Sequence, residues 1–409
     1  MFANISVLKK SHSGVDNHLD YLIYVCLCFY LLFDSVTGYL LEVGGPSISA
    51  IYKPFLLLLM ILSVALKNVN IICLVAFLFS FMFLSAFTHI VSDFPWNSES
   101  LAMSLQIISN QVYFIYFYFL LKPNNRLEKY TSNKFLAVNI FVFLCNIILG
   151  IFGFGFYTYR FAEIGIRGFF YAGNQVSVLF ICLYYIVLMR ISTKSNKILL
   201  VYAIGLVISL LITTRVSVAA CILISCIDYY FRSPKKRIFY IKLFSPFLLL
   251  ILIGLFVQLL PQTQFWQNVE HNFRRELGNR GNLADAVSSG RVTSFRNNYE
   301  VWSSYSSPAV ILFGFGPVIP QRGRVEIDFF DTFFHIGAVF TFFTLLFYIF
   351  LIYMSIRIKN MPLFLFNLLY LSISFTAGHV WHSVMPGLFY AYINAYTLVS
   401  YLNEKDNQC

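Results

Sequence analysis

The chain has 409 residues, of which 59% are hydrophobic and 11% are charged, and its formal net charge is +11. This composition excludes an ordinary soluble domain, because solvated loops alone would dilute the apolar fraction. It predicts an all-α polytopic membrane protein, since apolar segments of about 20 residues, the length that crosses a bilayer core, recur along the chain.

In chain order, the apolar segments predict twelve transmembrane helices. They are expected at residues 21–41, 47–66, 69–89, 101–121, 135–155, 171–190, 197–213, 215–231, 238–260, 332–356, 362–378 and 386–402. Almost nothing separates the seventh from the eighth, and their fusion would give eleven spans and put the termini on opposite sides. No cleavable signal peptide is expected, so the first span should act as the signal itself.

The basic residues predict the orientation of these spans. With residues 1–20 and 403–409 in the cytoplasm, every lysine except Lys53 falls on the cytoplasmic side. This asymmetry is typical of membrane proteins, and it requires a break near Arg215 to keep the later loops in phase. The positive charge is therefore a topological signal and gives no reason to expect nucleic acid as a partner.

One long hydrophilic segment, residues 261–331, separates the nine spans of 21–260 from the three spans of 332–402. It is expected to be periplasmic and partly helical, because apolar residues recur at helical spacing near its start. Most arginines lie in this loop or in other outward segments: Arg160, Arg167, Arg215, Arg274, Arg275, Arg280, Arg291, Arg296, Arg322 and Arg324. Long exported loops escape the usual charge preference, which accounts for the seven in 261–331 but poorly for Arg160, Arg167 and Arg215. A guanidinium group binds phosphate or carboxylate oxygens through a planar fork.

The stretch VEIDFFDTFFHIG at 325–337 contains carboxylates and a histidine where an apolar run begins. Asp328, Asp331 and His335 are spaced i, i+3 and i+7, which predicts that they share one helical face. We expect this face to point into a wet cavity while the phenylalanines meet lipid or neighbouring helices. Alternatively, Asp331 caps the helix N-terminus and His335 is a satisfied core histidine.

A histidine pair, His379 and His382, occupies the last outward segment. Two histidines three residues apart could bind a metal, but no third ligand is evident, so no metal and no cofactor are expected.

Four motifs, all on the predicted outward side, resemble those of the bacterial O-antigen polymerase and ligase superfamily of Wzy-type proteins. The resemblance covers roughly residues 160 to 390. Its motifs are an Arg-Gly-Asn stretch (Arg167, Gly168, Asn174), a Thr-Arg-Ser helix end (Thr214, Arg215, Ser217), a loop pattern (Ser289, Arg291, Trp302, Gly314, Gly316) and an entry to the next span (Glu326, Asp328, Gly337). The chain has Gly173–Asn174 where the family often has Pro-Asn, and it lacks the His-Asn pair of ligases, which favours a polymerase.

The resemblance implies a metal-independent glycosyltransferase of the bacterial inner membrane. A hydroxyl of one undecaprenyl-pyrophosphate-linked repeat unit would attack the anomeric carbon of another, and undecaprenyl pyrophosphate would leave. A clamp for the pyrophosphate is expected from Arg167, Arg215 and Arg291, with Arg160, Arg296, Arg322 and Arg324 in reserve. The proton acceptor would be Asp328, with His335 or His379 behind it.

Other contacts to the lipid-linked oligosaccharide are expected from Asn174, Glu326, Asp331 and Trp302. Membrane lipid and a chain-length regulator protein are further candidate partners. Two alternatives stay open: a ligase that transfers finished glycan to lipid A core, and a flippase or transporter of lipid-linked oligosaccharides.

Overall fold

The computed structural model describes residues 13–68, 76, 79–80, 98–121, 128–159, 163–191, 198–232, 291–304, 307–314, 325–376, 378 and 380–406. These residues form fourteen α-helices and one two-stranded sheet. The elements are α1 (Ser13–Cys28), α2 (Tyr30–Glu42), α3 (Ser49–Lys67), α5 (Ser98–Leu120), α6 (Glu128–Ile151), β1 (Phe156–Tyr159), β2 (Ile164–Gly168), α7 (Gly173–Arg190), α8 (Ile198–Ile212), α9 (Arg215–Arg232), α13 (Arg291–Ser304), α14 (Pro308–Phe313), α15 (Asp328–Ile336), α16 (Ala338–Arg357), α17 (Met361–Thr376) and α18 (Val384–Asp406).

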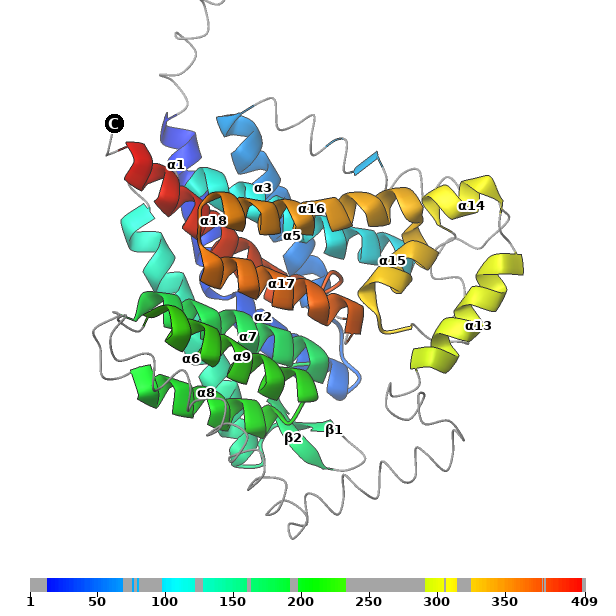
Figure 1. Cartoon of the computed structure of the whole chain (residues 1–409), viewed down its shortest axis with the longest axis horizontal. Helices are drawn as coiled ribbons and strands as arrows, with labels where there is room; N and C mark the ends of the chain where they lie inside the picture. The colour runs from blue at the N-terminus through cyan, green and yellow to red at the C-terminus, as the bar shows by residue number, and fades with distance from the viewer. Residues whose placement is uncertain are drawn as a thin grey trace, which may run out of the picture.

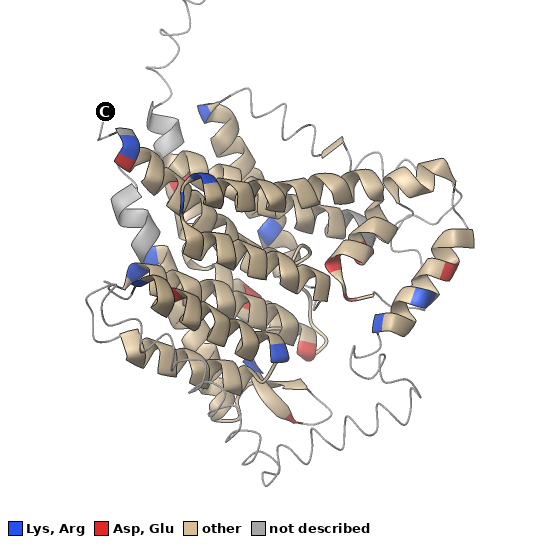
Figure 2. Ribbon diagram, viewed as in Figure 1, with Lys and Arg blue, Asp and Glu red and all other residues tan. Residues whose placement is uncertain are grey.

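The long helices lie side by side in one bundle, with α18 near its centre (Figure 1). Helix α18 packs on α5 and α7, and nearly all of its side chains from Val384 to Val399 are buried. The sheet, α13, α14 and α15 gather at one end of the bundle (Figure 1). Charged residues lie mostly near the helix ends (Figure 2), as expected when the middle of each helix lies in an apolar environment.

Several helices are suited to crossing a membrane. By length and composition these are α3, the Lys134–Ile151 part of α6, α7 and α16, together with the bent pair His18–Cys28 and Tyr30–Glu42. The shorter apolar helices α8 and α17 lie beside them. The predicted all-α class with several apolar helices is therefore confirmed. The predicted spans at 69–89 and 238–260 lie largely or wholly outside the described residues, whereas every other predicted span coincides with a helix or helix pair.

The predicted break between residues 213 and 215 is confirmed. Helix α8 ends at Ile212 and α9 begins at Arg215. Thr213 adopts a left-handed backbone with φ of 64°, and the Thr214 hydroxyl accepts a hydrogen bond from the Ser217 N–H at 3.1 Å. This side chain supplies the N-cap that starts the second helix.

Two predicted spans are each divided into two helices. The predicted span 332–356 is interrupted at Gly337, where φ is 90° and a Cβ atom would overlap the backbone of Leu312 and Gly314. Only glycine tolerates both the left-handed backbone and this close approach. The break separates the short helix α15 from α16 and lets α14 pack across their junction.

The predicted span 21–41 bends by 46° at Phe29, between α1 and α2. The Asn139 side chain donates to Leu27 O at 2.8 Å and accepts from Leu31 N at 3.0 Å. The Tyr52 hydroxyl donates to Cys26 O. Side chains of α6 and α3 thus pair the backbone groups that the bend exposes, a requirement for any helix interruption inside an apolar bundle.

Candidate functional site

The β1–β2 hairpin sits on the turn between α8 and α9. Its strands are antiparallel, with Tyr159 opposite Ile164. The Thr158 hydroxyl donates to Ile212 O at 3.0 Å, and Gly165, with φ of 75°, lies against the same carbonyl. The hairpin therefore lies directly beside the residues that lead into α9.

Arg215 is the first residue of α9, and its side chain is exposed. The turn before it is fixed by buried hydroxyls: Ser177 and Thr214 share a hydrogen bond of 2.6 Å, and Ser217 donates to Ser209 O at 3.1 Å. A cation at a helix N-terminus opposes the helix dipole at a cost of about 0.3–1 kcal/mol. The position suits a residue that faces an anion, not one that stabilises the helix.

Arg291 is the first described residue of α13. Its guanidinium donates to Thr376 O at 3.0 Å and lies 3.6 Å from the Glu326 carboxylate. These contacts fasten α13 to the end of α17 and to the segment that enters α15. Glu326 itself has a left-handed backbone with φ of 62°, a conformation that costs about 1–3 kcal/mol and is frequent at functional sites.

Arg215 and Arg291 both exert an electrostatic effect on Tyr159, at the end of β1. Burial raises the pKa of the Tyr159 phenol, and the positive charges of Arg215 and Arg291 both lower it. Two arginines from distant parts of the chain therefore act electrostatically on one tyrosine. No sequence motif marks Tyr159, so its place beside the predicted clamp could not be expected from the sequence.

Arg167 lies on the same hairpin but is buried. Only 6% of its side chain is exposed, its guanidinium lies 3.2 Å from the Glu42 carboxylate at the end of α2, and it stacks over the Phe156 ring at 5.4 Å. The Arg167 guanidinium therefore packs between the hairpin and the end of α2. Of the other predicted arginines, Arg296 is exposed on α13, and Arg160, Arg322 and Arg324 lie outside the described residues.

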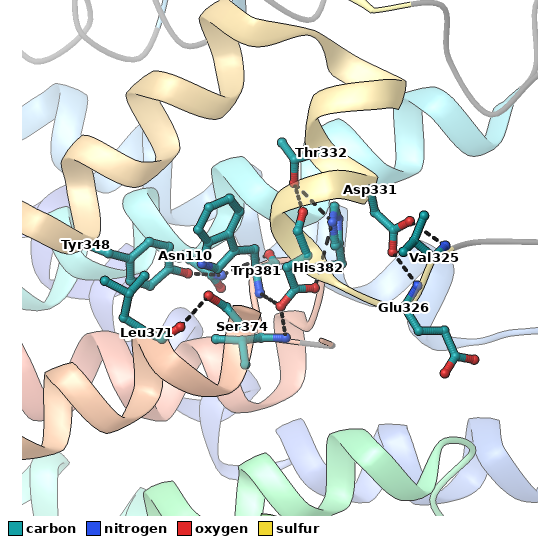
Figure 3. Close-up of polar contacts among 12 residues, drawn as sticks. Asn110, Val325, Glu326, Asp331, Thr332, Tyr348, Leu371, Ser374, Trp381 and His382 are labelled. Carbon is teal, nitrogen blue, oxygen red and sulfur yellow. Dashed lines mark hydrogen bonds and ion pairs between the residues drawn. The ribbon is translucent and has the colours of Figure 1, made fainter. Parts of the chain in front are cut away.

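The acidic face of α15 is buried, so the expectation of a wet cavity there is wrong. Exposure is 1% for Asp328, 3% for Asp331 and 6% for His335. The Asp331 carboxylate accepts from Val325 N at 2.8 Å and Glu326 N at 3.1 Å, as Figure 3 shows. Carboxylates can be buried here because they accept hydrogen bonds from backbone N–H groups that lack other partners.

Asp328 holds the segment between α17 and α18. Its Oδ2 atom accepts from Val380 N at 2.7 Å and Trp381 N at 3.1 Å, while Oδ1 lies 3.8 Å from His382 Nε2. The same histidine nitrogen is 3.2 Å from the Thr332 hydroxyl (Figure 3). Asp328 is thus a buried anchor for residues 380–382. His379 lies outside the described residues.

The phenylalanines of α15 pack on the neighbouring helix α13, which agrees with the expectation that they meet lipid or neighbouring helices. Phe330 contacts Phe295 at a ring distance of 4.7 Å, and Phe333 contacts Trp302 at 5.4 Å. Trp302, predicted to contact substrate, therefore takes part in this aromatic packing. Asn174 lies partly exposed in the first turn of α7, just after the hairpin.

Among the described residues, no three His, Cys, Asp or Glu side chains gather in a way that could hold a metal ion. Comparisons with protein-family models, curated proteins and solved structures found no match.

Proposed function

We propose that this chain is a membrane glycosyltransferase that polymerises oligosaccharide repeat units linked to undecaprenyl pyrophosphate. A hydroxyl of one unit attacks the anomeric carbon of the next, the glycosidic bond forms, and undecaprenyl pyrophosphate departs. The observation that carries this proposal is the place of Arg215 at the start of α9, beside the turn on which the β1–β2 hairpin sits. The charges of Arg215 and Arg291 both act on Tyr159 of this hairpin.

The proposed reaction needs stabilisation of the charge that develops on the departing pyrophosphate. Two guanidinium groups can supply it. Arg291 is held in place by Thr376 O and Glu326 and would have to exchange part of these contacts for the anion. The N-terminus of α9 adds its partial positive charge beside Arg215, and backbone N–H groups at such an end bind phosphate oxygens. The Tyr159 hydroxyl can donate a further hydrogen bond to the same anion.

The proposed orientation puts the hairpin, Arg215 and Arg291 on the periplasmic side of the bacterial inner membrane. Twelve spans, cytoplasmic termini and a periplasmic segment at 261–331 belong to this proposal. Basic residues at the opposite helix ends support it: Arg232, at the end of α9, donates to Ile191 O at 2.6 Å beside the end of α7. A chain-length regulator protein is a further proposed partner.

Replacing either clamp arginine tests the proposal. Arg215→Ala and Arg291→Ala should each abolish long-chain polysaccharide, seen as loss of the ladder on a gel of surface polysaccharide, while the protein still inserts. Arg215→Lys and Arg291→Lys should rescue poorly, because an ammonium group lacks the bidentate fork. Arg357→Ala, at the exposed end of α16, is the matched control and should give a normal ladder. Normal ladders from both alanine variants at 215 and 291 would end the clamp proposal.

A ligase would use the same clamp with a different acceptor, so deletion of the gene separates the two activities. A single repeat unit on the lipid A core indicates a polymerase, whereas loss of all attached glycan indicates a ligase. If the chain were a flippase, deletion of the gene would instead stop lipid-linked units from reaching the periplasmic leaflet.

A further inference from the structure

Helix α2 connects the bend at Phe29 with the buried Arg167 behind the anion site. One face of α2 carries Leu31, Ser35, Gly38 and Glu42, spaced i, i+4, i+7 and i+11. Residues at this spacing form a continuous stripe along a helix. Each of the four contacts α6 or the hairpin.

The first half of this stripe is fastened to α6 by two buried asparagines. Leu31 N donates to the Asn139 side chain at 3.0 Å. The Asn146 side chain donates to the Ser35 hydroxyl at 2.9 Å and accepts from Phe169 N at 3.0 Å. Asn146 therefore joins α2 directly to the residue that follows β2.

The second half of the stripe touches the hairpin itself. Gly38 packs so closely on Phe169 that a Cβ atom would overlap the Phe169 carbonyl oxygen. One turn later, the Glu42 carboxylate lies 3.2 Å from the Arg167 guanidinium. A shift of α2 along or about its axis must therefore move the hairpin that carries Arg167 and Tyr159.

A buried ion pair fixes α2 from the neighbouring face. The Asp34 carboxylate lies 2.6 Å from the Lys53 ammonium of α3 and accepts from the Ser49 hydroxyl at 2.8 Å. The Thr37 hydroxyl donates to Ser49 in turn, at 3.0 Å. Lys53 is also the one lysine that violates the predicted charge asymmetry.

Charges inside an apolar bundle are costly, and a buried ion pair is weak evidence for stability, since apolar side chains often replace it without loss. We infer that Asp34 and Lys53 are positioning residues. They hold α2, and through it the hairpin with Arg167 and Tyr159, at the place that the anion-binding arginines require. This inference rests on the proposed function.

The chain contains a matched control for this pair. Asp20 of α1 lies 2.6 Å from Lys67 of α3 and accepts from the Ser63 hydroxyl at 2.6 Å. In both pairs the serine precedes the lysine by four residues on α3. The Asp20–Lys67 pair, however, joins the middle of α1 to the end of α3, and its hydrogen bonds within the described residues reach neither α2 nor the hairpin. If both ion pairs only stabilised the fold, neutralising either pair would have the same effect on anion binding.

The experiment measures equilibrium binding of radiolabelled farnesyl diphosphate, a short prenyl diphosphate, to the purified full-length protein in nanodiscs, together with its melting temperature. Neutralising one pair by Asp34→Asn with Lys53→Met should weaken binding about tenfold, which corresponds to about 1.4 kcal/mol. Neutralising the other by Asp20→Asn with Lys67→Met should leave the affinity unchanged. Glu42→Gln should weaken binding in the same direction as the first double variant, and Glu42→Asp should restore part of it.

Two results separate the failure of this inference from that of the proposed function. If Arg215→Ala binds farnesyl diphosphate as the wild type does, the proposed anion site is rejected. If Arg215→Ala loses binding while the Asp34/Lys53 double variant binds normally, only the positioning inference is overturned. Should that double variant fail to fold, Glu42→Gln decides, because unchanged affinity there also overturns the inference.

Discussion

At the scale of single residues, Asp328 shows that a charged side chain can be a hydrogen-bond acceptor for buried backbone N–H groups. Its Oδ2 atom accepts hydrogen bonds from Val380 N and Trp381 N, and both of those residues are fully buried. A carboxylate that is already engaged and has 1% exposure is poorly placed to take a proton from a substrate hydroxyl. Its geometry favours an anchor for the segment that follows α17.

This assignment predicts the effect of two substitutions. Asp328→Ala leaves two buried N–H groups without an acceptor, at about 1–3 kcal/mol each, so the melting temperature of the purified protein should fall markedly. Asp328→Asn keeps one acceptor oxygen and should lose less. The measurement is thermal unfolding in detergent beside the polysaccharide ladder. An Asp328→Asn protein with wild-type melting but no polysaccharide would instead identify Asp328 as the proton acceptor expected from the sequence.

Other residue-level features explain which parts of the site the sequence could predict. Arg215 stood out because short outward segments seldom carry basic residues, and Arg291 stood out through the loop motif of the resemblance. Both charges act on Tyr159, which is consistent with the clamp expected from them. Tyr159 gave no signal, since its role depends on two arginines far away in the chain. The burial of Arg167 was equally hidden, because its partner Glu42 lies on α2.

At the scale of elements, hydropathy located the helices but not their interruptions. The break before Arg215 could be predicted because the charged loops had to stay in phase. The bend at Phe29 could not, because it depends on Asn139, whose side chain reaches it only in the folded bundle. Gly337 belongs to the entry motif of the resemblance, but the sequence did not reveal that it interrupts the helix. Its left-handed backbone lies closely packed against the end of α14.

The junction at Gly337 predicts a large effect of a single methyl group. Gly337→Ala must adopt a strained backbone, which costs about 1–3 kcal/mol, and must also push α14 away from the α15–α16 junction. Gly44→Ala is the matched control, because Gly44 also has a positive φ, 79°, but has open space around it. Thermal unfolding should show a clearly larger loss for Gly337→Ala. Equal losses would mean that close packing contributes nothing at this junction.

At the scale of the whole molecule, the two ends of the bundle differ in chemistry. One end carries the hairpin, Arg215 and the helices α13, α14 and α15. The other end carries the C-terminal ends of α7, α9, α16 and α18 (Figure 1). Basic residues lie at both ends (Figure 2), and those of the second end include Arg190, Arg232 and Arg357. The proposed function requires the first end to face the periplasm, where an undecaprenyl-linked glycan would be polymerised.

Cysteine labelling tests this orientation directly. Val43 lies exposed just after α2, and Arg357 lies exposed as the last residue of α16, so each can be replaced by cysteine as Val43→Cys and Arg357→Cys. In cells with a permeabilised outer membrane, a membrane-impermeant maleimide should label Val43→Cys at once and Arg357→Cys only after the inner membrane is lysed. The unsubstituted protein measures the background from its native cysteines. Labelling in the reverse order would put the arginines in the cytoplasm, away from any periplasmic substrate, and the proposed polymerase would be untenable even if both clamp variants lost activity.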